Sequence, residues 1–574
     1  MMDHVEVVKG SQGAAEKSKQ APNQQEIVSF LALGGLGEFG MNCLLIQSPI
    51  ARVLLDCGVM FPSPEHLGVD AITPDFSVLG EQPLDALLLT HGHEDHIGSI
   101  QHLLRWSAER GWPTPLRVIG SRFTLALVRR RLEEARLLSS VRLELLQAGE
   151  IMELGDLQIE AVRVHHSVPD ALAFAIDTPI GKIIHTGDWR IDSRPLLGDS
   201  TDLPRFGEIG SEGVRALFSD STNVDVEGFS VSEAVVAEHL SDVLDLAPAR
   251  VFVTLFSSNI ARMQSLLRAA HATHRKVVLY GMSMKQNFAV ARELGYITLP
   301  SPDILLDEAQ MRQLPQDELV VLCGGSQGEP SSTLARIAFG DHADFRVCAS
   351  DTLVFSSRSI PGNEKRIARV VDAFHRQGAR VVLPTERRVH TTGHACAEEQ
   401  RLLIGLLRPK LFVPVHGDFR QLTRHAELAR SMGVEQTYCF SNGELLSLGE
   451  DEVKLARHHE PSHNYTIGKL FRGADDELLR QRRHLAHNGC VCVAIRVNRS
   501  GELLAEPRIR DFALVIEPNG LMAGLQRLIR SSVKDYDGPW EEEALSEHLR
   551  GEIRRYFSKQ IDRRPVVLPL VLLE

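Results

Sequence analysis

The chain has 574 residues, of which 43% are hydrophobic and 24% are charged, and its formal net charge is −12. This length predicts about three or four domains, and the composition is ordinary for a globular protein. The acidic balance argues against a protein that coats nucleic acid through charge alone.

The ends of the chain and its cysteines bear on where the protein acts. Residues 1–26 are polar and aperiodic, without the apolar core of a signal peptide, and we expect a disordered tail there. The longest aliphatic stretch, Val566 to Leu573, is too short to span a bilayer. Eight cysteines occur without a CxxC pair, which favours buried free thiols in a reducing compartment. We therefore expect a cytoplasmic protein with no membrane partner.

The first predicted strands surround a glycine-rich turn. Residues 27–35 form a predicted strand, after which Gly35, Gly37 and Gly40 match GxGxxG in form. A dinucleotide-binding fingerprint needs a helix after these glycines, whereas residues 41–47 and 51–58 have the pattern of two more strands. We therefore interpret the glycines as turns between strands.

The apolar run Ala86 to Leu89 predicts a strand that ends in a loop crowded with ionisable side chains. They are His91, His93, Glu94, Asp95 and His96. Imidazole and carboxylate suit zinc and manganese, and such groups are costly to bury unpaired. A solvated loop is the alternative, but α/β layers bind ligands at the carboxyl ends of their strands. The loop therefore predicts a metal site.

Several later strand ends add candidate residues. In His165-His166 only one ring can face the metal loop, because neighbouring strand residues point to opposite faces. Asp188 closes a predicted hairpin that turns at residues 178–181. Asp56 and Asp220 also follow strands, where a turn or N-cap role is the alternative. Helices are predicted between these strands at residues 101–110 and 124–138.

From Val251 onward, aliphatic runs recur without polar alternation and helix-like segments separate them. This pattern predicts a parallel sheet covered on both faces, in a separate α/β domain at residues 225–381. Within it, Ser357 and Ser359 lie between a strand end and a helix start. Hydroxyl and backbone N–H groups at such a point suit a phosphate, although a plain tight turn is as good an explanation.

A second chemical cluster follows the inserted domain. It contains His390-Thr-Thr-Gly-His394, a predicted helix at residues 396–407, and His416 at the end of the apolar run 411–415. We interpret residues 456–474 as a linker. Beyond them, helices at 475–486, 520–531 and 540–560 and strands at 490–497 and 563–573 predict a small α/β domain.

Ten motifs carry a resemblance to a known family. In chain order they read GGLGEFGMN, THGHEDHIG, HSVPD, HTGDW, DSTN, GSQGEP, IPGNE, HTTGH, PVHGD and RRPVVLP. This series resembles the ribonuclease J branch of the metallo-β-lactamase superfamily, which belongs to the β-CASP group of nucleic-acid-processing enzymes. Two small departures are Asp418, where family members commonly have Glu, and Thr392, where they often have Ser.

The resemblance implies an α/β fold, namely a metallo-β-lactamase αββα sandwich with an inserted α/β β-CASP domain and a small C-terminal α/β domain. The implied boundaries are 27–224 and 382–455 for the two parts of the sandwich, 225–381 for the β-CASP domain and 475–574 for the C-terminal domain. By the same analogy the C-terminal domain assembles a homodimer or homotetramer.

The resemblance also assigns roles around two divalent metal ions, Zn²⁺ or alternatively Mn²⁺. It implies that His91 and His93 bind one metal, that Asp95 and His96 bind the second, and that Asp188 bridges both. The pattern HSxPD selects His166 as a further ligand, and His416 is the last. Asp56 would hold a ligand histidine from behind.

The implied activity is two-metal hydrolysis of RNA phosphodiesters, both 5′–3′ exonucleolytic and endonucleolytic, in RNA processing and decay. His394, held by Asp220, would protonate the leaving 3′ oxygen. Substrate phosphate would be gripped by His390, Thr391, Thr392, Gly393 and His394. Ser357 and Ser359 are candidates for a pocket that prefers 5′-monophosphorylated RNA ends. The alternatives are a β-CASP nuclease acting on DNA ends, a small-molecule hydrolase and a non-catalytic RNA-binding scaffold.

Overall fold

The structure is a computed structural model that describes residues 27–63, 65–360, 362–450, 452–468, 470–473, 477–514, 520–561 and 563–574. The predicted tail of residues 1–26 lies outside this range. The chain divides into two compact units, one of Met1–Val59 with Phe76–Pro461 and the other of Met60–Asp75 with Ser462–Glu574. No helix in the described part of the chain is long and apolar enough to cross a membrane.

Two twisted sheets form the centre of the first unit. The eight-stranded sheet has the order β23 (Val453–Arg457), β22 (Glu444–Leu448), β1 (Val28–Gly34), β3 (Cys43–Gln47), β4 (Arg52–Leu55), β6 (Ala86–Leu88), β7 (Leu116–Gly120) and β8 (Val141–Leu145). The seven-stranded sheet has the order β21 (Gln436–Thr437), β19 (Leu411–Val415), β13 (Ala216–Asp220), β12 (Gly181–His185), β11 (Leu172–Thr178), β10 (Leu157–Arg163) and β9 (Ile151–Leu154).

The sheets pack face to face because both contribute to one apolar core, in which Phe30 of the first sheet stacks on Phe218 of the second. Helices cover the outer faces. They are α2 (Ile100–Glu109) and α3 (Arg122–Glu134) beside the first sheet, and α4 (Leu203–Glu212), α11 (Ala397–Leu407) and α12 (Phe419–Ser431) over the second. This layering is the predicted αββα sandwich.

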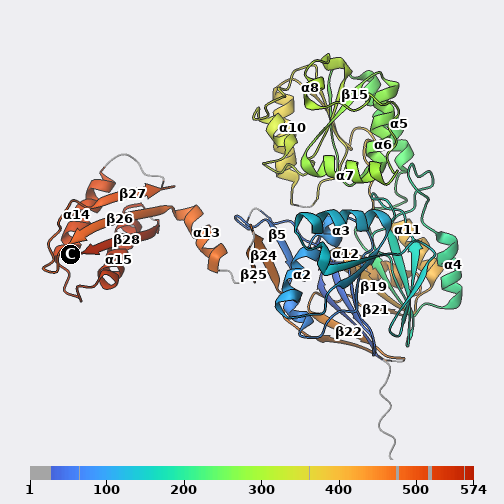
Figure 1. Ribbon diagram of the computed structural model, residues 1–574, viewed down its shortest axis with the longest axis horizontal. Helices are drawn as coiled ribbons and strands as arrows, with labels where there is room; N and C mark the ends of the chain where they lie inside the picture. Colours follow the sequence, from blue (N-terminus) through green and yellow to red (C-terminus); the bar gives the residue numbers. More distant parts are fainter. Residues whose placement is uncertain are drawn as a thin grey trace, which may run out of the picture. The chain divides into compact units, whose positions relative to one another are not determined.

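A five-stranded parallel sheet forms the inserted part of the first unit. Its order is β15 (Lys276–Tyr280), β16 (Leu319–Cys323), β14 (Val251–Thr254), β17 (Thr352–Phe355) and β18 (Arg380–Val382). On one face lie α5 (Glu233–Leu246), α6 (Ile260–Ala272) and α7 (Met282–Glu293), and on the other lie α9 (Thr333–Ala338) and α10 (Glu364–Arg376) (Figure 1). The short helix α8 (Glu308–Met311) precedes β16. Burial on both faces explains the continuous aliphatic runs of the sequence.

The second unit contains two small sheets. Strands β25 (Leu470–Gly473), β24 (His463–Ile467) and β5 (Ala71–Pro74) form one, and β27 (Arg508–Phe512), β26 (Cys490–Val497) and β28 (Val566–Leu573) form the other. Helices α14 (Leu521–Lys534) and α15 (Glu542–Ile561) pack on one face of the latter sheet, and α13 (Glu477–Asn488) precedes it.

The interpretation of residues 456–474 as a linker needs correction, because β24 and β25 lie inside that range. Strand β24 reads HNYTI and carries few aliphatic side chains, so its sequence does not announce a strand. Its partner β5 is far away in the chain, and buried Asn464 donates to the carbonyl of Pro74. Strand β24 is therefore held by hydrogen bonds to β5, a strand far away in the sequence, and not by a local apolar pattern.

Candidate metal centre and active site

The histidine-rich turn joins β6 to the short helix α1 (Glu94–Ile97), and backbone hydrogen bonds from neighbouring loops hold it in place. The amide of Asn42 donates to the carbonyl of Asp95, and the amide of Cys57 donates to that of His96. Gly58 lies so close that a Cβ atom there would be 1.6 Å from the carbonyl oxygen of Asp95. The turn is therefore a packed element of the fold rather than a solvated loop.

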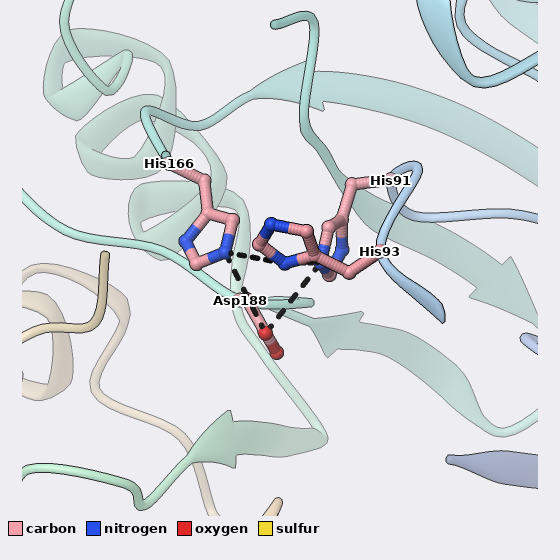
Figure 2. A group of neighbouring side chains, drawn as sticks. All are labelled: His91, His93, His166 and Asp188. Atoms are coloured by element: carbon pink, nitrogen blue, oxygen red, sulfur yellow. Dashed lines mark hydrogen bonds and ion pairs between the residues drawn. The ribbon is translucent and has the colours of Figure 1, made fainter. Parts of the chain in front are cut away.

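One group of ligand-type side chains consists of His91, His93, His166 and Asp188, whose donor atoms all lie within 4.8 Å of one another (Figure 2). Asp188 Oδ2 is 3.6 Å from Nε2 of His91 and 3.8 Å from Nε2 of His166. Nδ1 of His93 is 3.0 Å from Nε2 of His91. Three rings and one carboxylate from three separate strand ends thus point at a common centre.

A second group consists of Asp95, His96, His416 and again Asp188. Nε2 of His416 is 3.4 Å from Asp95 Oδ2 and 3.5 Å from Asp188 Oδ1, and Nε2 of His96 is 3.3 Å from Asp188 Oδ2. The structure therefore brings together all seven residues predicted as ligands, with Asp188 between the two groups.

Asp188 provides a test of whether divalent cations fit here. The residue is 2% exposed, and its Oδ2 has no hydrogen-bond partner in the described part of the chain, although ring nitrogens surround it. A buried carboxylate in that condition is costly unless cations are nearby. Imidazole nitrogens and carboxylate oxygens are ligands that Zn²⁺ and Mn²⁺ accept, so the donor set fits.

Outer hydrogen bonds fix the orientation of the rings. Nδ1 of His96 lies 2.7 Å from Oδ2 of Asp56, as predicted for that residue, and Nδ1 of His166 lies 2.6 Å from the carbonyl oxygen of Gly393. Nδ1 of His416 is 2.7 Å from Oγ1 of Thr222. Each contact leaves Nε2 aimed at the centre, which is the arrangement expected for metal-ligating histidines.

His416 owes its position to an unusual backbone. It has a φ of 56°, in the left-handed region that non-glycine residues seldom adopt. Its neighbours Gly417–Asp418 form the short strand β20, which pairs with β2 (Leu36–Gly37). The glycine-rich turn near residue 37 therefore holds His416, a candidate ligand, in place, and the prediction of turns rather than a nucleotide-binding helix is confirmed.

The two groups differ in their proton affinity. Burial lowers the pKa of His91 and His166 well below the usual value and that of His93 to about 4. For His96 and His416 burial acts in the same direction, but Asp188 and the other nearby carboxylates outweigh it and raise the pKa well above the usual value. A cation bound by the second group would therefore compete with protons for these ring nitrogens.

Beside both groups lies the pair His394 and Asp220. Nδ1 of His394 is 2.8 Å from Asp220 Oδ2, and Asp220 Oδ1 accepts from the amide and the hydroxyl of Thr222. Burial would raise the pKa of Asp220, but His394 and the other histidine nearby outweigh it and hold the pKa well below the usual value. Asp220 is therefore an anion that fixes Nδ1–H of His394 and leaves Nε2 free.

The segment from His390 to His394 is shaped by contacts with distant residues. Asn223 donates to Thr392 Oγ1 at 2.7 Å and to the carbonyl of His394 at 3.0 Å, and it accepts from Arg358. Thr391 Oγ1 donates to the carbonyl of Val231. A Cβ atom on Gly393 would lie 2.6 Å from the His166 ring, so only glycine fits there.

The two candidate phosphate-binding serines differ. Ser357 is 5% exposed, and its Oγ has no hydrogen-bond partner among the described residues, whereas Ser359 Oγ donates to the carbonyl of Ile360.

Two further histidines near the site are not among the predicted ligands. Nδ1 of His165, the neighbour that the family motif passes over in favour of His166, lies 3.3 Å from the carbonyl oxygen of Asp199. His185, next to the hairpin end, belongs to neither ligand group.

Sequence analysis missed Arg262, which is fully buried on α6. Its guanidinium binds both carboxylate oxygens of Glu233 at 2.8 and 2.9 Å. The remaining nitrogen donates to the carbonyl of Ser356 and to Nδ1 of His390, both at 2.8 Å. One side chain thus ties the start of the Ser357–Ser359 loop to the start of the His390–His394 segment.

Comparisons with known proteins agree with this arrangement. Four family models match: a beta-lactamase superfamily domain at residues 51–199, the ribonuclease J beta-CASP domain at 248–374, a Zn-dependent metallo-hydrolase RNA specificity domain at 380–439, and the ribonuclease J C-terminal domain at 477–573. Ribonuclease J of Sinorhizobium meliloti is 38% identical over 86% of this chain and 86% of its own length. Ribonuclease J of Synechocystis is 34% identical over 95% of this chain and 86% of its own length.

The chain belongs to the ribonuclease J family. Ribonuclease J2 of Bacillus subtilis, 32% identical over 95% of this chain and 99% of its own length, is another relative. Membership in this family and the His/Asp groups together support divalent metal binding. The matched ribonucleases lend no support to the alternative of a nuclease for DNA ends.

A solved structure shows the fold as well. The crystal structure of a protein of unknown function from Enterococcus faecalis has a TM-score of 0.53 and 16% identity, and it covers 74% of this chain and 100% of its own. At that identity the likeness concerns the fold alone.

Proposed function

We propose that this ribonuclease J family member is a metal-dependent ribonuclease of the cytoplasm that cuts RNA phosphodiesters in RNA processing and decay, both from the 5′ end and internally. The observation that carries the proposal is the convergence of seven ligand-type side chains in two groups that share Asp188. The His394–Asp220 pair next to them supplies a proton donor, which a metal-storage or scaffold protein would not need.

In this proposal two cations, Zn²⁺ or Mn²⁺, are held by the two groups. His91, His93 and His166 would bind one, Asp95, His96 and His416 the other, and Asp188 both. Bound cations would lower the pKa of a coordinated water from about 15.7 toward 7 and offset negative charge on the reacting phosphate.

His394 acts as the general acid. Asp220 accepts Nδ1–H, so a protonated His394 presents Nε2–H to the substrate, and that proton passes to the 3′ oxygen as its bond to phosphorus breaks. The products carry a 3′ hydroxyl and a 5′ phosphate. Asp220 remains an anion in this step, since the nearby histidines hold the pKa of its carboxyl well below the usual value.

The segment from His390 to Gly393 grips the phosphate that is cut. Arg262 donates to Nδ1 of His390, so the neutral ring carries its proton on Nε2 and can donate it to a phosphate oxygen. Ser357 and Ser359 form the pocket for a 5′ monophosphate, and the unpartnered, buried hydroxyl of Ser357 supports that role.

Assembly into a homodimer or homotetramer is assigned to the C-terminal domain. The face of the β26–β28 sheet away from α14 and α15 exposes Leu568, Leu570 and Leu572, a row of apolar side chains that suits a subunit contact. Leu570→Lys should lower the molecular mass seen by analytical ultracentrifugation.

The domain boundaries that we propose are those predicted from the sequence, except that residues 456–474 are not a linker.

A single digestion tests the proposed function. The purified, metal-reconstituted protein is given 5′-monophosphorylated RNA, the same RNA with a 5′ triphosphate, and DNA of the same sequence. We expect hydrolysis of both RNAs, release of single nucleotides mainly from the monophosphorylated one, and no cleavage of the DNA. Equal cleavage of DNA would contradict the proposed substrate class.

A further inference from the structure

The outer face of α10 carries three basic side chains and one acidic side chain, and none of the three basic ones is ion-paired in the described part of the chain. Lys365, Arg369, Asp372 and Arg376 are spaced by four, three and four residues, so they share one face, and all four are exposed. Within the described residues the side chains of Lys365, Arg369 and Arg376 make no ion pair or hydrogen bond. The opposite side of the helix packs into the core of the inserted sheet.

A hollow of about 420 Å³ opens beside the second half of this face. Arg369, Asp372 and Arg376 line it together with Phe339, which follows α9 and is 55% exposed. Unpaired guanidinium groups attract phosphates, and an exposed aromatic ring can stack on a base. This combination fits single-stranded nucleic acid, and it is unusual on a chain whose net charge is −12.

The segment that precedes α10 contacts the candidate active site. The helix begins at Glu364, shortly after Arg358, and Arg358 donates to Asn223. Asn223 in turn holds Thr392 and the carbonyl of His394. From Lys365 to Arg376 the helix extends about 16 Å, at about 1.5 Å per residue, so the basic face leads away from that loop.

We propose that this basic face, formed by Lys365, Arg369 and Arg376 with Phe339, binds the part of an RNA that lies 5′ of an internal cleavage site. The inference rests on the proposed function. If the loop of Ser357 and Ser359 holds the 5′ end of an exonuclease substrate, an RNA cut internally must continue past that loop on its 5′ side. The face of α10 begins where that continuation leaves the loop. An RNA whose 5′ end sits in the pocket does not reach it.

The test separates internal cleavage from trimming by the choice of substrate. A circular single-stranded RNA has no ends and reports internal cleavage alone, whereas a short 5′-monophosphorylated RNA of about five nucleotides reports trimming. The variants are Arg369→Gln, Arg376→Gln and both together, because glutamine keeps helix propensity and removes only the charge. Arg268→Gln on α6 is the matched control, since α6 covers the opposite face of the same sheet (Figure 1) and Arg268 is exposed.

We expect the double variant to bind and cleave the circular RNA about five- to tenfold less well through a raised KM, with trimming unchanged within about twofold. The slope of log affinity against log salt should fall by about 1.4, at roughly 0.7 for each lost phosphate contact on a single strand. Arg268→Gln should behave as the wild type.

Three results would overturn the inference. They are equal losses on both substrates, no loss on the circular RNA, and a changed molecular mass in analytical ultracentrifugation, which would make this face a contact between copies of the chain. A wild type that cleaves neither RNA would overturn the proposed function, and this inference with it.

Discussion

The histidine-rich turn at residues 91–96 and the segment at residues 390–394 serve one site but are built differently. The turn is short, follows a buried strand and is fixed by backbone bonds from β3 and β4 and their loops. The later segment is fixed by side chains that arrive from α6, from the β13 loop and from the β17 loop. The first region is therefore a property of the sandwich alone, whereas the second depends on the inserted domain.

This difference separates two kinds of failure. If the proposed function is right, damage to the turn should remove the cations, whereas damage to the later segment should leave them bound and remove proton transfer or substrate binding. Metal content and turnover measured on the same variant distinguish the two regions.

The largest effect is expected from His91→Ala combined with His93→Ala, because two of the three imidazoles of one group are lost. Bound metal measured by elemental analysis should fall, and RNA hydrolysis should drop by more than the roughly 10²–10⁴-fold typical of a lost general acid. His102→Ala on α2 is the control, since it removes an imidazole outside both groups. Unchanged metal content in the double variant would disprove the ligand assignment.

His394→Ala should act differently. We expect kcat to fall roughly 10²–10⁴-fold with metal content and KM nearly unchanged, because a general acid works mainly in the transition state. Asp220→Asn should give a smaller loss of kcat, since the ring keeps its place but loses the anion that stabilises its protonated form. Wild-type turnover by His394→Ala would remove the acid role from this residue.

The same contrast explains what could be predicted from the sequence. The turn is recognisable because four of the seven predicted ligands fall within six positions, directly after an apolar run. Asp188 follows β12 and His416 follows β19, and their motifs predict them as ligands. By contrast, Arg262 contacts His390, 128 residues away, and no local pattern marks it. Asn223 belongs to the DSTN motif, but its bond to Thr392, 169 residues away, could not be read from that motif.

The fold also has a region that the sequence predicts and a region that it does not. Aliphatic runs at β14, β16 and β17 predicted the parallel sheet, because strands buried on both faces need no polar alternation. The sequence of β24 favours a linker, because the strand depends on pairing with β5, a partner that periodicity does not reveal.

Substitution of Arg262 tests how much its contacts with distant residues contribute to the free energy of unfolding. Arg262→Met leaves Glu233 buried without its partner, which typically costs about 3–5 kcal/mol of unfolding free energy. Lys285→Met, which breaks the half-exposed pair with Glu308, should cost less than about 1 kcal/mol. Urea unfolding of the two variants measures the difference. If the double change Arg262→Met with Glu233→Met is no more stable than Arg262→Met alone, the cost does not come from an unpaired carboxylate.

The smallest expected effect is a change in stability with pH that involves His425 on α12. This side chain is buried behind Asp220, where the turn at residues 91–96 and the segment at residues 390–394 meet. Its Nδ1 lies 3.0 Å from Ser221 Oγ, and burial lowers its pKa to about 3. Since the unfolded chain binds the proton more readily than the folded one, the stability contributed by neutral His425 is complete above about pH 6.5. It is lost as the pH falls toward 3, by about 1.4 kcal/mol per pH unit.

His425→Gln cannot titrate, so the wild-type unfolding free energy minus that of the variant should be flat above pH 7 and decline between about pH 6.5 and 4. Histidines and carboxylates common to both proteins cancel in this difference. A difference that stays constant across that range would mean that solvent reaches His425 when it takes up a proton. The support behind Asp220 would then be looser than the hydrogen bonds of Ser221 and Gln400 around it indicate.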